Sequence, residues 1–281
     1  MSDAGTLLRA LTARFQAAGI DSARLDARLL VAEVFGVEPL YLATHPEIVV
    51  TAQQQAAIEV MAARRENREP ISHILGRRGF WTLDLLVTKD TLDPRPDTET
   101  LVQGVLDRVG DRQAALRLLD FGTGSGCILL ALLSELPNAQ GLGIDQSAGA
   151  VAVAAENARR NGLDVRARFQ PGNWGDDLAG PFDVIVSNPP YIPDADIAGL
   201  EPEVACHEPI TALAGGADGL NCYRHLVPEM ARLLAPGGLA GFEVGAGQAE
   251  AVAGLFSTHG FYDVRITQDL AGIGRCVFAL R

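Results

Sequence analysis

With 281 residues, 48% of them hydrophobic and 21% charged, the chain is long enough to bury a large core in one or two globular domains. Its formal net charge of −12 disfavours direct binding to DNA, and it has neither an apolar run of about 18 residues nor a basic-then-apolar leader, so we expect no membrane span and no signal peptide. The four cysteines stand apart from one another and from any histidine cluster, which predicts no structural metal site and a cytoplasmic location.

Residues 1–74 are predicted to form a small helical domain. Apolar side chains recur at helical spacing in three segments of this region. Gly19 and Gly36 are placed to end the first two helices, Asp21 or Ser22 to begin the second, and Thr51 to begin the third. None of the three segments carries a catalytic cluster.

Residues 75–95 are predicted to form a β-hairpin linker, with its turn in the Gly-Arg-Arg-Gly sequence at 76–79. Basic side chains are concentrated between residues 64 and 95. Two interpretations remain open for them: a solvated helix end and hairpin, or a basic patch that meets an RNA-containing partner.

Residues 96–281 alternate between apolar strand-like runs and helical segments, a pattern typical of a mostly parallel sheet with helices on both faces. The two final runs, at 262–270 and 274–281, are joined by too few residues for a parallel crossover. They are therefore predicted to form an antiparallel hairpin.

A glycine-rich loop follows the first of these strands. Gly122, Gly124 and Gly126 allow a sharp turn and the close approach of a ligand, although a tight turn without a ligand has the same glycines. Asp145 ends the next strand, where a carboxylate suits the two ribose hydroxyls of an adenosine, unless it caps the following helix, a role that Ser147 fills equally well. Loop and acid together indicate NAD or S-adenosylmethionine.

The sequence Asn-Pro-Pro-Tyr at 188–191 ends the fourth strand, at the edge of the sheet where α/β folds place their chemistry. Asn188 supplies a side-chain acceptor, and Pro189 supplies a backbone carbonyl that the rigid rings hold in place. Together they accept both hydrogens of a planar NH₂ group, on which Tyr191 stacks, and so aim its nitrogen at an electrophile. A methyl sulfonium is such an electrophile, and this favours S-adenosylmethionine over NAD.

These motifs, in this order, resemble the HemK/PrmC family, the glutamine N5-methyltransferases of peptide chain release factors. The resemblance continues in PRPDTETLV (94–102), EPITALAGGADGL (208–220), EVGAGQ (243–248), DLAGIGR (269–275) and the N-terminal AGIDSARLDARLL (18–30), and so spans nearly the whole chain. It implies a class I S-adenosylmethionine-dependent methyltransferase, a Rossmann-like α/β fold with a mostly parallel seven-stranded sheet and an antiparallel final hairpin.

The resemblance also implies a set of site residues. The cofactor-binding residues would be Gly122, Thr123, Gly124, Ser125, Gly126, Asp145, Trp174 and Asn188; the catalytic residues Asn188, Pro189 and Tyr191; and the substrate-binding residues Asn188, Pro189, Pro190 and Tyr191. The acid that often precedes the tryptophan in the family is Asn173 here. Arg95 would lie near the methionine end of the cofactor or be solvated, and Glu243 would touch the site or simply end its strand.

The implied substrate is the glutamine of the Gly-Gly-Gln loop of class 1 release factors, and residues 1–74 would then help to dock this large partner. We expect a monomer. The alternatives are a glutamine methyltransferase acting on a ribosomal protein and a DNA adenine-N6 methyltransferase, which shares a similar corner but needs a basic cleft. An NAD-dependent oxidoreductase lacks the expected glycine spacing, and a regulatory protein without turnover would not need Asn188 and Tyr191.

Overall fold

The computed structural model describes residues 3–281, and the chain forms two compact units. The first contains the N-terminal part up to Gly76 together with a later stretch, Glu201–His207. The second contains Arg77–Leu200 and Glu208–Arg281. The sequence pattern did not indicate that Glu201–His207 belongs with the N-terminal part. No helix within residues 3–281 is long and apolar enough to cross a membrane.

The first unit, called the helical unit below, consists of six helices. They are α1 (Ala4–Ala17), α2 (Ala23–Phe35), α3 (Tyr41–Thr44), α4 (Ala52–Glu66), α5 (Ile71–Leu75) and the later α9 (Pro202–Ala205). Gly36 ends α2 with φ of 65°, and Thr51 begins α4 with a complete capping box to Gln54, as the sequence predicted. Side chains such as Leu11 and Ile58 form the buried core of this unit.

A short hairpin, β1 (Arg77–Phe80) and β2 (Leu83–Leu86), follows in the second unit, called the catalytic unit below. The predicted hairpin is confirmed, but the predicted position of its turn is wrong. Gly76 adopts φ of 69° to end α5, so the two arginines lie in the strand and the chain reverses after Phe80, where Trp81 has φ of 55°. Pairing Phe80 with Leu83 buries Phe80 and Leu85, which explains the shift.

A seven-stranded sheet forms the centre of the catalytic unit, in the order β5-β4-β3-β6-β7-β9-β8. The strands are β3 (Arg117–Phe121), β4 (Gln140–Asp145), β5 (Ala167–Pro171), β6 (Phe182–Ser187), β7 (Leu234–Glu243), β8 (Tyr262–Gln268) and β9 (Gly274–Leu280). The first five pair in parallel, whereas β9 is antiparallel to both β7 and β8. The predicted mostly parallel sheet with a final antiparallel hairpin is confirmed.

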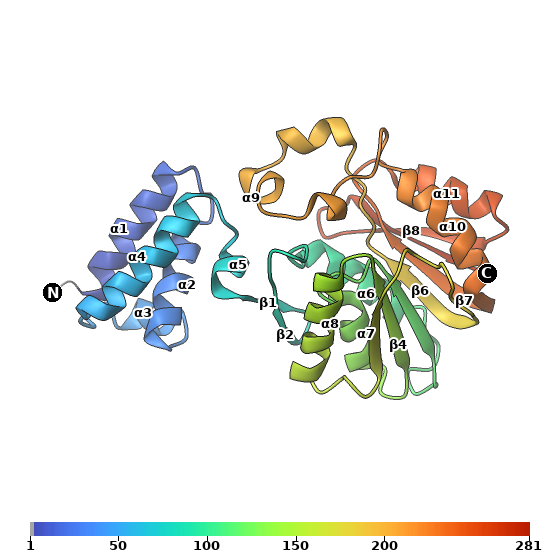
Figure 1. Ribbon diagram of the computed structural model, residues 1–281, viewed down its shortest axis with the longest axis horizontal. Coiled ribbons are helices and arrows are strands. Elements are labelled where there is room, and N and C mark those ends of the chain that lie inside the picture. Colours follow the sequence, from blue (N-terminus) through green and yellow to red (C-terminus); the bar gives the residue numbers. More distant parts are fainter. Residues whose placement is uncertain (1–2) are drawn as a thin grey trace. The chain divides into compact units, whose positions relative to one another are not determined.

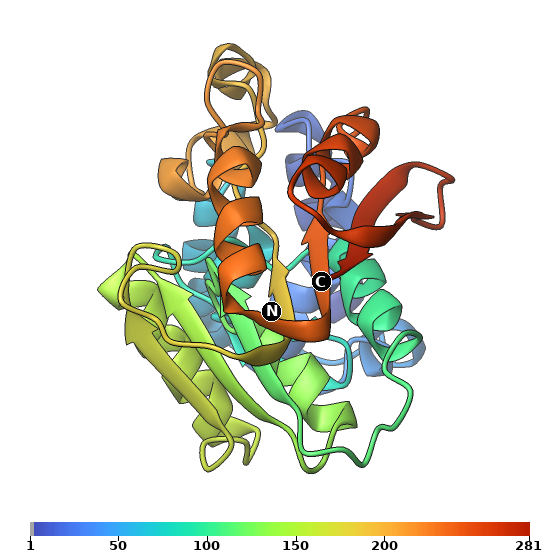
Figure 2. The same cartoon turned by 90° about the vertical axis from the view of Figure 1, so that its right-hand side faces the viewer.

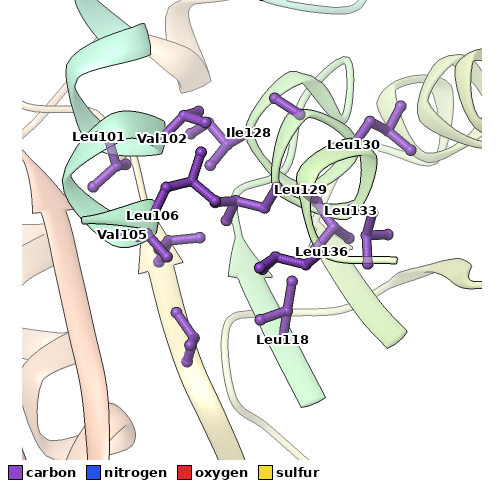
Figure 3. Packing of buried hydrophobic residues seen from close by; sticks show 14 of the residues in the cluster. Leu101, Val102, Val105, Leu106, Leu118, Ile128, Leu129, Leu130, Leu133 and Leu136 are labelled. Atoms are coloured by element: carbon purple, nitrogen blue, oxygen red, sulfur yellow. The ribbon is translucent and has the colours of Figure 1, made fainter. Parts of the chain in front are cut away.

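Helices cover both faces of this sheet (Figures 1 and 2). One face packs against α6 (Glu99–Leu106), α7 (Cys127–Glu135) and α8 (Ala148–Arg160), and the other against α10 (Asn221–Leu233) and α11 (Ala249–Thr258). Successive strand residues serve the two faces in turn: Leu118 packs with the α6 and α7 leucines shown in Figure 3, and Leu119 with the opposite core. Each such buried leucine contributes roughly 1.5–3 kcal/mol.

The strand order determines where a ligand can bind. Strand β3 pairs with β4 on one side and β6 on the other, so the chain direction across the sheet reverses there. The carboxyl ends of β3 and β6 border the crevice that α/β sheets use for ligands. The glycine loop leaves β3 at this edge, and the Asn-Pro-Pro-Tyr corner leaves β6.

Candidate active site

Left-handed backbone conformations shape the glycine loop. Gly122, Gly124 and Gly126 have φ of 66°, 54° and 81°, a region that other residues rarely adopt. The loop is tied to its surroundings through Thr123, whose N–H donates to the Ile144 carbonyl and whose hydroxyl donates to Asp120 at 2.6 Å. Gly122 and Gly124 remain partly exposed, whereas Gly126 is buried at the start of α7.

Asp145 lies at the end of β4, facing the glycine loop. Its carboxylate accepts hydrogen bonds from the Gly124 N–H and the Ser147 N–H, both at 2.9 Å. Ser147 is the residue that caps α8, because its hydroxyl accepts from the Ala150 N–H. A carboxylate has about four lone-pair positions, so Asp145 keeps acceptor capacity for a ribose diol.

A cavity opens at this edge of the sheet. Its wall includes eight of the predicted site residues: Gly122, Thr123, Gly124, Ser125, Asp145, Trp174, Asn188 and Pro190. The Trp174 indole lies beside Gly122, where an added Cβ would come within 3.5 Å of the ring. A flat aromatic wall, a carboxylate and an open glycine loop fit the adenine, ribose and amino-acid parts of S-adenosylmethionine.

Three predicted site residues do not line this cavity. Gly126 precedes α7, where its left-handed conformation begins the helix. Pro189 is buried in the corner itself, and Tyr191 is half-buried beyond it. The roles assigned to them from the sequence stay predictions. Asn173 occupies the position where the family often has an acid. Its side-chain amide donates to the Asp176 carboxylate at 2.9 Å.

The corner is held at the end of β6 by its neighbours. The Ser187 hydroxyl donates to the Phe121 carbonyl at 2.7 Å and so joins the ends of β6 and β3. The Asn188 amide donates through Nδ2 to the Thr98 hydroxyl at 3.4 Å. In this orientation the Oδ1 acceptor of Asn188 is left for a ligand.

Two of the resemblance motifs pack against Tyr191. Gly215 and Gly219 bring their backbone so close to the Tyr191 backbone that a Cβ at either position would collide with it. The Gln248 amide donates to the Tyr191 carbonyl at 2.9 Å, and a Cβ on Gly245 would lie 3.0 Å from the tyrosine ring. Burial raises the pKa of the Tyr191 phenol to about 12, so the ring remains neutral.

The sequence analysis did not identify the part of the cavity wall that is formed by residues 209–212. Pro209, Thr211 and Ala212 line the cavity, and the preceding Glu208 accepts from the Asp93 N–H at 3.2 Å. Arg95 also lines the cavity and lies 3.5 Å from the Glu208 carboxylate. Burial raises the pKa of Glu208 to about 7. The Glu-Pro sequence at 208–209 was the available signal, but only as part of the resemblance.

The basic segment is not a free cationic patch. Five of its arginines lie within 4 Å of a carboxylate: Arg64, Arg65, Arg68, Arg78 and Arg95. Arg65 is buried, so neither of the two sequence interpretations describes it. Within residues 3–281, no group of histidine, cysteine or acidic side chains is arranged to hold a metal ion.

The chain is similar to known proteins over nearly its whole length. Residues 6–76 match the family described as PrmC N-terminal domain, and residues 112–246 match a methyltransferase domain. The release factor glutamine methyltransferase of Rhodospirillum rubrum is 53% identical, covering 99% of this chain and 85% of its own length. The protein of the same name from Caulobacter vibrioides is 47% identical, covering 98% of this chain and 96% of its own.

The fold has a counterpart among solved structures. A methyltransferase from Pyrococcus furiosus superimposes with a TM-score of 0.53 at 17% sequence identity, covering 82% of this chain and 98% of its own. At this level of identity the likeness concerns the fold alone.

Proposed function

This chain belongs to the release factor glutamine methyltransferases, and we propose that it transfers a methyl group from S-adenosylmethionine to N5 of the glutamine in the Gly-Gly-Gln loop of class 1 release factors. The observation that supports the proposal most directly is the position of Asn188. Its amide lies on the wall of the same cavity as the glycine loop and Asp145. The side chain proposed to accept the substrate amide and the residues proposed to bind the adenosine cofactor therefore line one cavity.

The chemistry follows from the acceptors at the corner. The cofactor supplies an electrophilic methyl group on its sulfonium. A glutamine amide nitrogen is a weak nucleophile, because its lone pair is delocalised into the carbonyl. Asn188 Oδ1 and the Pro189 carbonyl accept the two N–H groups, orient the nitrogen, and stabilise the positive charge that grows on it. As the N–C bond forms, the C–S bond breaks and its electron pair stays on sulfur; the methylated nitrogen then becomes a neutral amide by losing one N–H proton.

The remaining residues hold the cofactor and shape the entrance. The glycine loop would receive the amino-acid end through its backbone, Asp145 the ribose, and Trp174 the adenine ring. A Gly-Gly-Gln loop has almost no side-chain bulk beside its glutamine, so it can enter a narrow site. We further propose a cytoplasmic monomer that does not bind DNA directly, consistent with the net charge of −12.

Product mapping tests the proposal. Purified protein is incubated with methyl-labelled S-adenosylmethionine and a class 1 release factor, and the modified residue is located by mass spectrometry. We expect one methyl group on the glutamine of the Gly-Gly-Gln loop. A methyl group found only on a ribosomal protein or on DNA adenine, when these are supplied in parallel, would contradict the proposal.

The helical unit is proposed to dock the body of the release factor. Leu40 and Tyr41 are large apolar residues that are 71% and 43% exposed on this unit. Replacing both with alanine should raise KM for whole release factor several-fold, on the order of the loss of one or two interface side chains. KM for a short Gly-Gly-Gln peptide should not change. Val165→Ala, at a 76% exposed position of the catalytic unit, is the matched control. Equal changes for protein and peptide would contradict the docking role.

A further inference from the structure

A buried carboxylate lies behind the Asn-Pro-Pro-Tyr corner. Glu243 ends β7 and is only 2% exposed. Its Oε2 atom has no hydrogen-bond partner within residues 3–281. Burying an acidic group without full compensation is costly, and a glutamine or a leucine would avoid that cost. A function is therefore the natural explanation for an acid at this position.

The sheet places Glu243 next to the reactive corner. Strands β6 and β7 are parallel, with Ser187 opposite Phe242, so Asn188 and Glu243 follow at adjacent ends. The Thr98 and Asn188 side chains lie near enough to the Glu243 carboxyl to lower its pKa, and they are hydrogen-bonded to each other at 3.4 Å. Thr98 and Asn188 line the cavity and Glu243 does not, so the acid lies behind the cavity wall.

The direction of the hydrogen bonds follows from the acid. An ionised carboxylate only accepts hydrogen bonds, so its charge favours a Thr98 hydroxyl that points its single hydrogen toward Glu243. The Thr98 oxygen can then only accept from its other neighbour, and it receives the Asn188 Nδ2–H at 3.4 Å. This arrangement directs the NH₂ group of Asn188 inward and its Oδ1 acceptor outward.

We propose that Glu243 is a positioning residue that orients the Asn188 amide, directly and through Thr98, so that Oδ1 faces the substrate nitrogen. The inference rests on the proposed function. Without the acid, the amide can rotate by 180° and present its own NH₂ to the substrate NH₂, which places two donors against each other.

The charged surroundings of Glu243 make this orientation dependent on pH. Burial raises the pKa of Glu243 to about 7. The groups that face it are Asp97 before α6, Arg275 and Cys276 on β9, Tyr191 after β6, Tyr223 on α10, and Cys127 on α7. Arg275 does not neutralise it in a close pair, because its guanidinium lies 3.1 Å from Asp269 and 3.4 Å from Asp97. A protonated Glu243 can donate, which removes the fixed direction of the bonds.

Kinetics of the whole enzyme with release factor test the proposal. For the wild type, kcat should rise with pH through a midpoint near 7, as Glu243 ionises. Glu243→Gln keeps the size and shape of the side chain but cannot ionise. Its kcat should therefore be lower than that of the wild type and should not vary with pH between about pH 6 and 8. Glu243→Met should lower kcat by on the order of 10-fold or more, while KM for S-adenosylmethionine stays within about two-fold. Cys276→Ala, opposite Glu243 in the β7–β9 pairing, should keep the wild-type pH profile.

A double-mutant cycle separates positioning from direct proton transfer. If Glu243 acts only through Asn188, the Asn188→Ala/Glu243→Met enzyme should be no slower than Asn188→Ala alone. Losses that multiply would overturn the proposal, because they would mean that Glu243 acts on the reaction independently of Asn188.

An NMR measurement tests the orientation without turnover. The Asn188 side-chain NH₂ signals of the wild type should shift with a midpoint near pH 7, and the shift should be absent in Glu243→Gln. If the wild type methylates release factor, but the Asn188 signals change neither with pH nor on Glu243→Gln substitution, the inference fails while the proposed function stands. If wild type does not methylate release factor, the proposed function fails, whatever the signals show.

Discussion

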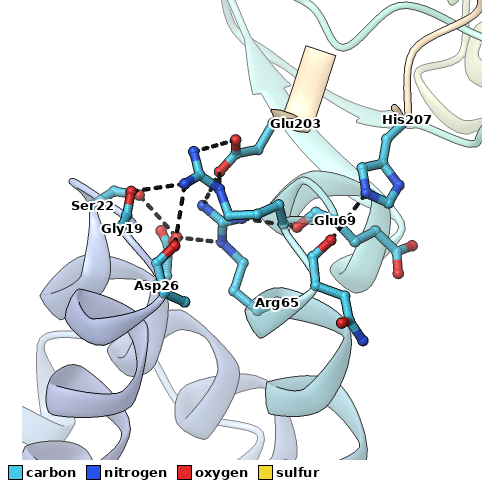
Figure 4. A network of polar contacts seen from close by, with 10 residues as sticks. Gly19, Ser22, Asp26, Arg65, Glu69, Glu203 and His207 are labelled. Atoms are coloured by element: carbon cyan, nitrogen blue, oxygen red, sulfur yellow. Dashed lines mark hydrogen bonds and ion pairs between the residues drawn. The ribbon is translucent and has the colours of Figure 1, made fainter. Parts of the chain in front are cut away.

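Each of the two units buries acidic side chains, and Asp26 in the helical unit and Glu243 in the catalytic unit have different surroundings. In the helical unit, Asp26 lies 2.7 Å from the buried Arg65 guanidinium. Glu203 of α9 accepts from both Arg65 and Arg68 (Figure 4). In the catalytic unit, Glu243 is equally buried, yet one of its oxygens lacks a partner within residues 3–281.

The difference is the basis for proposing a structural role for the acids of the helical unit and a functional role for Glu243. In the helical unit Asp26 and Glu203 both pair with Arg65, at 2.7 Å and 3.0 Å, and this network joins α2 and α4 to the Glu201–His207 stretch. Pro209, which lines the cavity, follows soon after the end of this stretch in the sequence. Glu243 is instead left with polar neighbours that it can orient. We therefore expect stability to depend on the first group and turnover on the second.

The largest expected effect is on stability in the helical unit. Asp26→Asn removes one partner of a buried ion pair and leaves Arg65 partly uncompensated. The free energy of unfolding should fall by about 3 kcal/mol, the low end for such a loss, because Glu203 remains. Urea denaturation measures it. Glu156→Gln, in the surface group with Arg159 and Arg160, should leave the midpoint unchanged. If Asp26→Asn and Glu156→Gln lowered the free energy of unfolding equally, the buried ion pair would contribute no more to stability than the surface group.

A comparable effect, on turnover alone, is expected at the corner. Asn188→Ala should lower kcat by on the order of 10²-fold, equivalent to about 2.7 kcal/mol of transition-state stabilisation. The urea midpoint should change little, because Asn188 is only partly buried. Steady-state kinetics and denaturation on the same preparation measure both quantities. Retention of the full rate would show that the amide is not oriented by this side chain.

The smallest expected effect has the opposite sign. The folded pKa of Glu243, about 7, exceeds its ordinary value of 4.5, so between these values the folded protein binds more protons than the unfolded chain. This acid therefore makes the folded protein less stable as pH rises from about 4.5 to 7. Glu243→Gln should match the wild type near pH 5 and be more stable by on the order of 2 kcal/mol near pH 8.

Urea denaturation at the two pH values measures this difference. Asp120 and Glu208, whose pKa values burial also raises to about 7, are present in both proteins and cancel from it. A variant that is slower but more stable would identify Glu243 as an acid retained for function. A loss of stability at pH 8 would instead place it with the structural acids of the helical unit.

The amino-acid sequence alone predicted the parts of this protein that depend on neighbouring residues. Apolar periodicity predicted the strands of the sheet and the longer helices, but not the short helices α3, α5 and α9. The glycines and prolines predicted the loop after β3 and the corner after β6, because backbone conformation is largely local. The hairpin turn was misplaced, since pairing that buries Phe80 and Leu85 outweighed a local glycine signal.

Only the tertiary structure decided which distant residues meet. It placed Glu203 on Arg65, Glu208 against Asp93, and Glu243 behind Thr98 and Asn188. These residues are separated by up to 145 positions, as between Thr98 and Glu243, and no periodicity or local propensity links them. In the catalytic unit the order of strands in the sheet brings Glu243 beside Asn188, whereas in the helical unit the packing of helices brings Asp26 to Arg65. The low polarity of each buried site strengthens these interactions, as a close ion pair in the helical unit and as the proposed orienting contact in the catalytic unit.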